Sequence, residues 1–227
     1  MNAIKPPNQI YSIRRDFRTE FSWRIFRIMA EFIEGFQFLA DLKKEVTFFG
    51  SARFNQGNLH YRQALKLGRM LGKDGYTIVT GGGPGIMEAG NRGANESGAE
   101  SVGLNIQLQR EQRINKYVKK GIGFYYFFTR KVMLSASAQA YVFFPGGFGT
   151  IDEFFELVML IQTKKMEPIP IVLIGRDFWA GLISWIDEKA YKKHHCISKD
   201  DRRIYTLVDT PEEAYAIITK TKERAYY

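Results

Sequence analysis

The sequence contains little that could cross-link the chain or anchor it in a membrane. One cysteine, Cys196, stands among 227 residues, so no intrachain disulfide can form. No uninterrupted apolar run approaches the ~20 residues that a membrane-spanning helix needs. The first residues show neither an apolar signal core nor a small-residue cleavage site. These absences favour a cytoplasmic protein with no membrane partner.

Histidine is also scarce, which bears on metal binding. His194 and His195 adjoin Cys196, and the third histidine, His60, is remote in the sequence. Adjacent residues near a helix end rarely converge on one ion, and no second ligand cluster accompanies them. We therefore predict no metal site.

Positive charge is abundant but dispersed. The net charge is +9, which favours anionic partners. Nucleic-acid-binding proteins more often concentrate their charge on one element, whereas here only short pairs such as Lys119-Lys120 occur. This distribution favours a solvated basic surface and a small anionic ligand, and we predict no nucleic-acid partner.

Apolar segments alternate with amphipathic ones along the chain. This alternation predicts a parallel sheet with helices on both faces. The predicted fold is α/β, a single Rossmann-like, doubly wound sheet in residues 21–227, preceded by a polar N-terminal arm in residues 1–20. An extra aromatic helix is predicted at 21–44. The predicted strands are 46–50, 76–80, 101–106, 140–144, 170–175 and 204–209, with helices at about 58–73, 85–97, 150–163, 178–192 and after a capping box at 210–213.

Three loops follow predicted strands and have binding character: GSAR (50–53), TGGGPGIME (80–88) and PGGFGTIDE (145–153). Ligands of parallel sheets bind beyond the carboxyl ends of the strands. Glycines allow a phosphate to approach backbone N–H groups at a helix start. No lysine precedes Thr150, so the last loop is not a triphosphate-binding P-loop. A monophosphate ligand remains open.

The carboxylate Glu153 has two interpretations. If Thr150 begins the helix, the T-x-x-E spacing forms a capping box and Glu153 only bonds the backbone. Alternatively, Glu153 faces the sugar of a bound nucleotide. In cleavage of a glycosidic bond, positive charge develops at the anomeric carbon, and a carboxylate stabilises that charge or activates water.

The segments GGGPGIMEAGNRGA (81–94) and PGGFGTIDE (145–153) together resemble the Lonely Guy (LOG) family of cytokinin riboside 5′-monophosphate phosphoribohydrolases, long labelled lysine decarboxylases. FFTRKVML (127–134) resembles the family segment that carries an Arg-Lys pair. The resemblance covers roughly residues 46 to 190. The aromatic helix before the first strand resembles the larger, second type of the family.

The resemblance implies residue roles. The catalytic pair falls on Arg130 and Glu153. Substrate-binding positions fall on Gly50, Ser51, Gly82, Gly83, Lys131, Gly146, Gly147, Gly149 and Thr150. Plant members carry a ligand-contacting threonine where Met159 aligns here, which leaves the base or sugar preference open.

The implied activity is hydrolysis of a purine nucleoside 5′-monophosphate, AMP or an N6-modified AMP, to free base and ribose 5-phosphate, without a cofactor. A general nucleotide 5′-monophosphate nucleosidase of salvage and a non-catalytic nucleotide sensor or carrier are the alternatives. Lysine decarboxylation is disfavoured, because it needs pyridoxal phosphate on a lysine whose context we do not find. A homodimer or higher homo-oligomer is expected.

Overall fold

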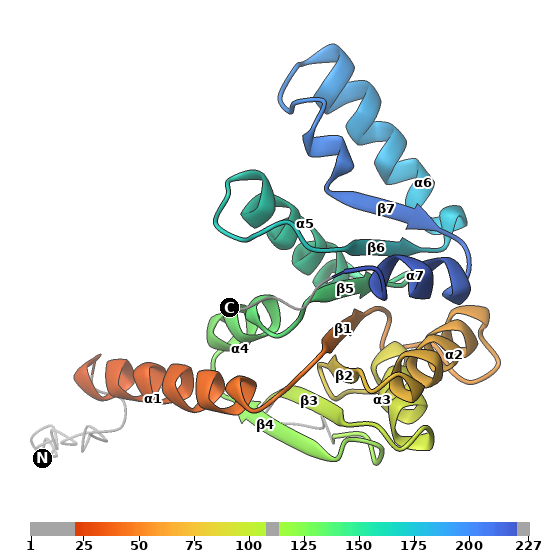
Figure 1. Ribbon diagram of the computed structural model, residues 1–227. Coiled ribbons are helices and arrows are strands. Elements are labelled where there is room, and N and C mark those ends of the chain that lie inside the picture. Colours follow the sequence, from red (N-terminus) through yellow and green to blue (C-terminus); the bar gives the residue numbers. More distant parts are fainter. Residues whose placement is uncertain (1–20, 108–113, 222–227) are drawn as a thin grey trace, which may run out of the picture.

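The computed structural model describes residues 21–107 and 114–221, so the predicted arm at 1–20 lies outside the described residues. The strands within these ranges form one parallel sheet in the order β4-β3-β2-β1-β5-β6-β7 (Figure 1). Their bounds are β1 Glu45–Phe49, β2 Thr77–Thr80, β3 Ser101–Ile106, β4 Lys120–Phe124, β5 Ala140–Phe143, β6 Ile171–Ile174 and β7 Tyr205–Val208. The predicted α/β class is confirmed.

Helices cover both faces of the sheet, and each face has its own apolar core. One core joins the sheet to α1 (Phe21–Ala40), α4 (Phe127–Ala136), α5 (Phe148–Gln162) and α6 (Arg176–Trp185). The other joins it to α2 (Leu59–Lys73), α3 (Ile86–Glu96) and α7 (Pro211–Ile218). The central strands β1, β2, β3, β5 and β6 are buried throughout, as expected for a sheet covered on both sides.

Two elements were not predicted from the sequence. Strand β4 has the sequence KGIGF, in which two glycines interrupt the apolar pattern, and it forms the edge of the sheet with mostly exposed side chains. Helix α4, which begins at Phe127, contains the segment FFTRKVML (127–134), for which no secondary structure was predicted. The predicted helix at 178–192 also differs, because α6 ends at Trp185 and continues as a π-helix, Ile186–Lys193.

The order of the strands reverses between β1 and β5. From β1 the chain builds outward through β2, β3 and β4, and it then returns to place β5 on the other side of β1. The carboxyl ends of these two neighbours are in register at Phe49 and Phe143. The loops that follow them leave the sheet where the strand order reverses, and ligands of open α/β sheets bind at such a point.

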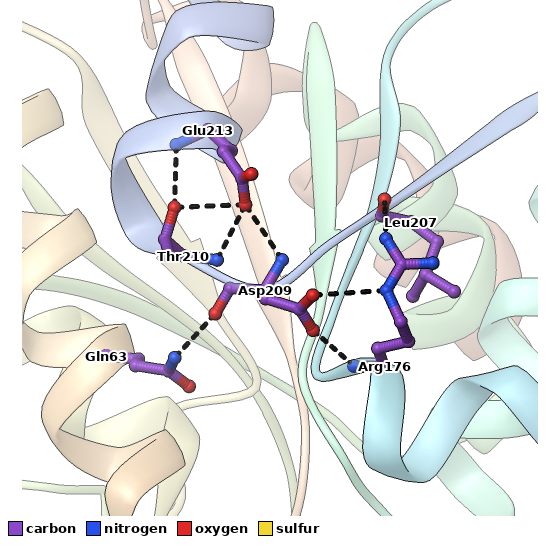
Figure 2. A network of polar contacts seen from close by, with 6 residues as sticks. All are labelled: Gln63, Arg176, Leu207, Asp209, Thr210 and Glu213. Atoms are coloured by element: carbon purple, nitrogen blue, oxygen red, sulfur yellow. Dashed lines mark hydrogen bonds and ion pairs between the residues drawn. The ribbon is translucent and has the colours of Figure 1, made fainter.

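The last helix is fixed by a polar network at the end of β7 (Figure 2). The Thr210 side chain accepts a hydrogen bond from the Glu213 N–H, and Glu213 accepts one from the Thr210 N–H, which confirms the predicted capping box. Asp209 accepts hydrogen bonds from Arg176 at the start of α6, and its carbonyl accepts one from Gln63 of α2. These contacts hold three helices around one strand end.

Candidate active site

A cleft of about 1000 Å³ opens at the carboxyl ends of β1 and β5. It is lined by residues of all three loops that follow these strands and β2, and by residues of α4 and α5. Most of the residues singled out from the sequence lie in this lining: Gly50, Ser51, Arg130, Lys131, Gly146, Gly147, Gly149, Thr150 and Glu153. Segments separated by about a hundred residues thus meet at the point where the strand order reverses.

Ser51 ties the three loops together through its backbone. Its N–H donates to the Pro145 carbonyl at 3.0 Å, which extends the β1–β5 pairing beyond the strand ends. Its carbonyl accepts from the Ile86 N–H at 3.0 Å, at the start of α3. Gly85 has φ 71°, and a Cβ there would lie 2.2 Å from the Ser51 oxygen, so only glycine fits this approach.

Helix α5 presents its N-terminus to the cleft. Gly147 is its N-cap and provides no side-chain cap. The first N–H groups of any helix lack intrahelical partners and favour an anion. A Cβ added at Gly147 or Gly149 would meet nothing within 4 Å, whereas a Cβ at Gly146 would lie 2.1 Å from Thr150 Oγ1. The buried Thr150 side chain therefore covers Gly146, and the backbone at Gly147 and Gly149 stays open to a ligand.

The capping-box interpretation of Glu153 is wrong. The helix begins at Phe148 and not at Thr150, so Thr150 already lies inside the first turn and donates its N–H to the Gly147 carbonyl. The sequence signal failed because Gly147, which has no side chain, serves as the N-cap three residues before Thr150, whose hydroxyl resembles that of an N-cap. Glu153 therefore does not cap the helix, and a capping role does not account for a glutamate at this position.

Glu153 is a buried carboxylate that faces the cleft. Its side chain is nine-tenths buried, and Oε2 has no hydrogen-bond partner among the residues that the structure describes. Burial raises the pKa of Glu153 to about 7, an effect opposed by the positive charges of Lys131 and Arg130 and reinforced by Glu156. An ionised carboxylate is costly in such a place, and perturbed carboxyl groups in clefts are typical of functional sites.

Arg130 comes from the first turn of α4. Its Nε donates to the Leu104 carbonyl of β3 at 2.7 Å, and its guanidinium lies against Gly81, where a Cβ would be 2.3 Å from a terminal nitrogen. Burial lowers the pKa of Arg130, and the charge of Glu153 opposes this effect. Within the described residues, the hydrogen bond to Leu104 thus fixes the cation at a position where Arg130 lines the cleft.

Lys131 connects α4 to α5. Its ammonium group pairs with Asp152 and, at 2.8 Å, with Glu156, the residues that flank Glu153 on the helix. Burial alone would lower the pKa of Lys131, but the hydrogen bonds to both carboxylates outweigh it and raise the pKa. Lys131 therefore fixes the face of α5 that carries Glu153.

Comparison with known proteins places this site in a family. Residues 87–218, which include both catalytic candidates, match the family model described as possible lysine decarboxylase. The chain belongs to this family, the LOG family. The resemblance predicted from the sequence is confirmed at the level of the family.

Named LOG relatives are similar at modest identity. A rice protein named probable cytokinin riboside 5′-monophosphate phosphoribohydrolase LOGL5 is 27% identical over 154 residues, 66% of this chain and 61% of its own length. The rice protein named LOG is 26% identical, over 72% of this chain and 67% of its own. An Escherichia coli pyrimidine/purine nucleotide 5′-monophosphate nucleosidase is 27% identical over 65% of this chain and 34% of its own.

Solved structures share the fold. The X-ray structure of TM1055, a structural genomics target, matches with a TM-score of 0.60 and 26% identity, over 79% of this chain and 100% of that one. The molybdenum cofactor carrier protein of Chlamydomonas reinhardtii matches with a TM-score of 0.59 over 78% of this chain and 97% of that one. At 19% identity the second likeness concerns the fold alone.

Some positions to which the LOG resemblance assigns ligand binding do not line the cleft. Gly82 and Gly83 are absent from its lining, and Gly81 is present in their place. The carbonyls of Gly82 and Gly83 accept hydrogen bonds from the Asn115 side chain, which fixes the backbone of this loop. Met159 also lies outside the lining and is about half exposed.

Several lining residues were not among the site residues predicted from the sequence. Phe127, Phe128 and Phe178 bring aromatic rings to the cleft, and Arg53 brings a further cation. Phe127 and Phe128 are neighbours in the first turn of α4, whereas Phe178 lies in the first turn of α6 and Arg53 in the loop after β1, so no single spacing links all four residues. Two hints were available in the sequence: Phe127 and Phe128 end the aromatic run GFYYFF (123–128), and Arg53 ends the loop GSAR (50–53). Stacking of a planar base on such rings is a common use of aromatic lining.

Neither a membrane span nor a metal-ligand cluster accompanies this cleft in the described ranges. No helix within residues 21–107 and 114–221 is long and apolar enough to cross a membrane. Within the same ranges, no three histidine, cysteine, aspartate or glutamate side chains are grouped as ligands for a metal ion.

Proposed function

We propose that this protein hydrolyses the N-glycosidic bond of a purine nucleoside 5′-monophosphate, releasing the free base and ribose 5-phosphate. The observation that carries the proposal is Glu153, a buried carboxylate with an unpartnered oxygen, in a cleft that also contains an open helix start. The two features suit opposite ends of one nucleotide. Membership of a family whose relatives bear phosphoribohydrolase and nucleosidase names supports the same reaction.

The start of α5 is the proposed phosphate site. Its unpaired N–H groups and the positive end of the helix dipole stabilise an anion. Gly147 and Gly149 leave room for phosphate oxygens to reach the backbone. Glu153 lies one turn further along the same helix, so a nucleotide bound by its phosphate would direct its ribose toward the carboxylate. In the transition state the ionised carboxylate stabilises the oxocarbenium-like sugar or positions the attacking water.

Arg130 is the proposed partner in catalysis. Its planar guanidinium is fixed by the Leu104 carbonyl and can donate further hydrogen bonds to the base or the sugar. Orientation of the leaving base and stabilisation of the charge that it accepts both assist cleavage of the bond. Lys131 supports the site by holding Asp152 and Glu156 on either side of the catalytic carboxylate.

AMP or an N6-modified AMP is the proposed substrate. The names of the rice relatives favour a cytokinin riboside monophosphate, and the name of the E. coli relative favours a broader nucleotide 5′-monophosphate nucleosidase. The aromatic rings of Phe127, Phe128 and Phe178 suit a planar base in either case. A panel of purine and pyrimidine monophosphates, with prenylated AMP, separates the two.

Lysine decarboxylation is disfavoured by the state of Lys131, the lysine in the described lining of the cleft. A lysine that forms a Schiff base must be available as a neutral amine, which requires a lowered pKa. Here two carboxylates raise the pKa of Lys131 and occupy its ammonium group.

The test is chromatography of the products after incubation with AMP, adenosine, ADP and ATP. We expect adenine from AMP, none from adenosine, and little from ADP or ATP, because the cleft has no P-loop lysine for the extra phosphates. Binding of AMP without release of adenine would contradict the proposed reaction and favour a nucleotide sensor or carrier.

We also propose that the protein acts as a homodimer or higher homo-oligomer. Large apolar side chains are exposed along α1, among them Phe26, Met29 and Ile33. Phe127 of α4, the helix against which α1 packs, is exposed as well. Contiguous exposed apolar surface of this kind is typical of an interface, and the self-complementary partner is a second copy of the chain.

A further inference from the structure

Glu31 is a buried carboxylate on α1 that lies outside the cleft. Its Oε1 accepts a hydrogen bond from the Tyr125 N–H at 2.9 Å. Its Oε2 accepts from the Tyr126 N–H at 3.3 Å and from the Thr129 hydroxyl at 2.6 Å. The carboxylate of Glu31, on the N-terminal helix α1, therefore holds the segment that leads into α4.

Helix α4 needs this external partner, because it does not cap itself. Its N-cap is Tyr126, whose side chain forms no cap hydrogen bond. An uncapped N-terminus leaves N–H groups unsatisfied and exposes the positive end of the helix dipole. Glu31 supplies both a hydrogen-bond acceptor and negative charge at this position, so it acts as a cap provided by another helix.

The contact between the two helices is close and fixed. A Cβ added at Gly35, one turn after Glu31, would lie 2.5 Å from the sulfur of Met133, so glycine allows α1 to pass against α4. The guanidinium of Arg27, one turn before Glu31, lies 3.9 Å from the centre of the Tyr125 ring. The buried carboxylate is held between these contacts, which leaves it little freedom to move.

The segment fixed by Glu31 carries a catalytic candidate. Thr129 immediately precedes Arg130, and the Arg130 N–H donates to the Tyr126 carbonyl in the first turn of α4. A shift in this turn would move the Arg130 side chain away from the Leu104 carbonyl that fixes it. A misplacement of about 1 Å can cost on the order of 100-fold in rate, even when its origin is remote from the chemistry.

We propose that Glu31 is a positioning residue for the active site, which holds the first turn of α4 so that Arg130 points into the cleft. This inference rests on the proposed function for its catalytic consequence. It also assigns to the N-terminal helix a role in the site itself, although no residue of α1 lines the described cleft.

The first experiment compares Glu31→Gln with Glu34→Gln, a matched change at an exposed position of the same helix. Both oxygens of Glu31 accept hydrogen bonds, whereas glutamine has only one acceptor oxygen. The NH₂ group of glutamine would face an N–H or hydroxyl donor, so at least one of these hydrogen bonds would be lost. We expect Glu31→Gln to lower kcat for AMP by about tenfold, which corresponds to about 1.4 kcal/mol and lies within the range for loss of a helix cap. KM should change little, since the phosphate site lies on α5. Glu34→Gln should leave both unchanged.

A double substitution distinguishes positioning from general destabilisation. In the Arg130→Lys background, Glu31→Gln should reduce turnover by less than about twofold, because residues that act through one another are not additive. A full second reduction in that background would overturn the proposal.

A spectroscopic measurement separates this proposal from the proposed reaction. The Arg130 Nε–H is buried and hydrogen-bonded, so its NMR signal should exchange slowly with solvent in the parental protein. Glu31→Gln should accelerate that exchange by about tenfold, and Glu34→Gln should not. If the parental protein releases no base, the proposed function fails and this signal alone decides the role of Glu31. Unchanged exchange in Glu31→Gln would overturn the positioning role, whatever the reaction.

Discussion

Arg130 and Glu153 line one cleft from two helices, and each opposes the effect of burial on the other. The charge of Glu153 counteracts the lowering of the Arg130 pKa, and the charge of Arg130 counteracts the raising of the Glu153 pKa. Among the described residues, Glu153 Oε2 has no hydrogen-bond partner. The two charges therefore influence each other across the cleft while this oxygen stays available to a substrate.

Substitution of Glu153 by glutamine should separate charge from shape. Glutamine is nearly isosteric but neutral, so turnover of AMP should fall by at least ~100-fold, the scale of a lost electrostatic or acid–base contributor. The AMP-induced rise in melting temperature should persist, because the phosphate site is unaltered. Arg130→Lys, which keeps the charge but loses the planar fork, should also reduce turnover with the fold intact. Parental turnover in Glu153→Gln would exclude the carboxylate from the mechanism.

The raised pKa of Glu153 predicts opposite trends for stability and activity. Between pH 4.5 and about 7 the folded state keeps a proton that the unfolded state has released, so the free energy of unfolding falls as pH rises. The loss amounts to as much as about 3 kcal/mol, at ~1.4 kcal/mol per pKa unit. Glu153→Gln should therefore melt higher than the parent at pH 8 and similarly at pH 4. Thermal melts at both pH values check this, and equal shifts at both would contradict it.

If the ionised carboxylate is the active form, kcat/KM for AMP should rise with pH to a plateau above the pKa of about 7. The substrate phosphate ionises nearby, with a second pKa of about 6. The residual activity of Glu153→Gln serves as the control, since it retains the phosphate contribution and lacks the carboxylate. A rate that falls as pH rises from 6 to 8 would instead assign Glu153 the role of a proton donor.

Alanine substitutions of the glycines at the start of α5 should have different effects on stability and on AMP binding. Gly149→Ala places a methyl group in open space in the unliganded protein, so the fold should keep its melting temperature. KM for AMP should rise by about tenfold or more, since the backbone is no longer open to phosphate. Gly146→Ala should instead lower the melting temperature, because its Cβ would lie 2.1 Å from Thr150 Oγ1. Melting curves with steady-state kinetics distinguish the two, and an unchanged KM in Gly149→Ala would place the phosphate elsewhere.

The exposed face of α1 predicts self-association. The parental chain of 26.2 kDa should sediment at micromolar concentration as a dimer or larger species. Ile33→Arg, at an exposed position, should shift the association equilibrium toward the monomer. Burial of the arginine charge in an apolar interface would remove its hydration without providing a partner, which is energetically costly. Circular dichroism should show the fold retained. A parental monomer would exclude this interface.

The fold class and most residues of the candidate site can be predicted from the amino-acid sequence. Apolar strands alternating with helices indicate a parallel sheet, since only a sheet covered on both faces buries such strands, and glycines after a strand predict an anion site. These signals are local in the chain. They failed where the pattern was weak, in the glycine-interrupted edge strand β4, and where two signals competed, at Thr150, which resembles an N-cap although Gly147 occupies that position.

Which of these residues lie close together depends on the packing of the folded chain. The reversal of strand order between β1 and β5 brings Ser51 beside Pro145, and the packing of α4 on the sheet brings Arg130 to Gly81 and into the cleft with Glu153. The position of Gly82 and Gly83 behind the cleft and the cap that Glu31 provides to α4 likewise have no signature in spacing. Contacts between distant segments depend on the packing of whole elements, and that packing is a property of the folded chain rather than of any short stretch of its sequence.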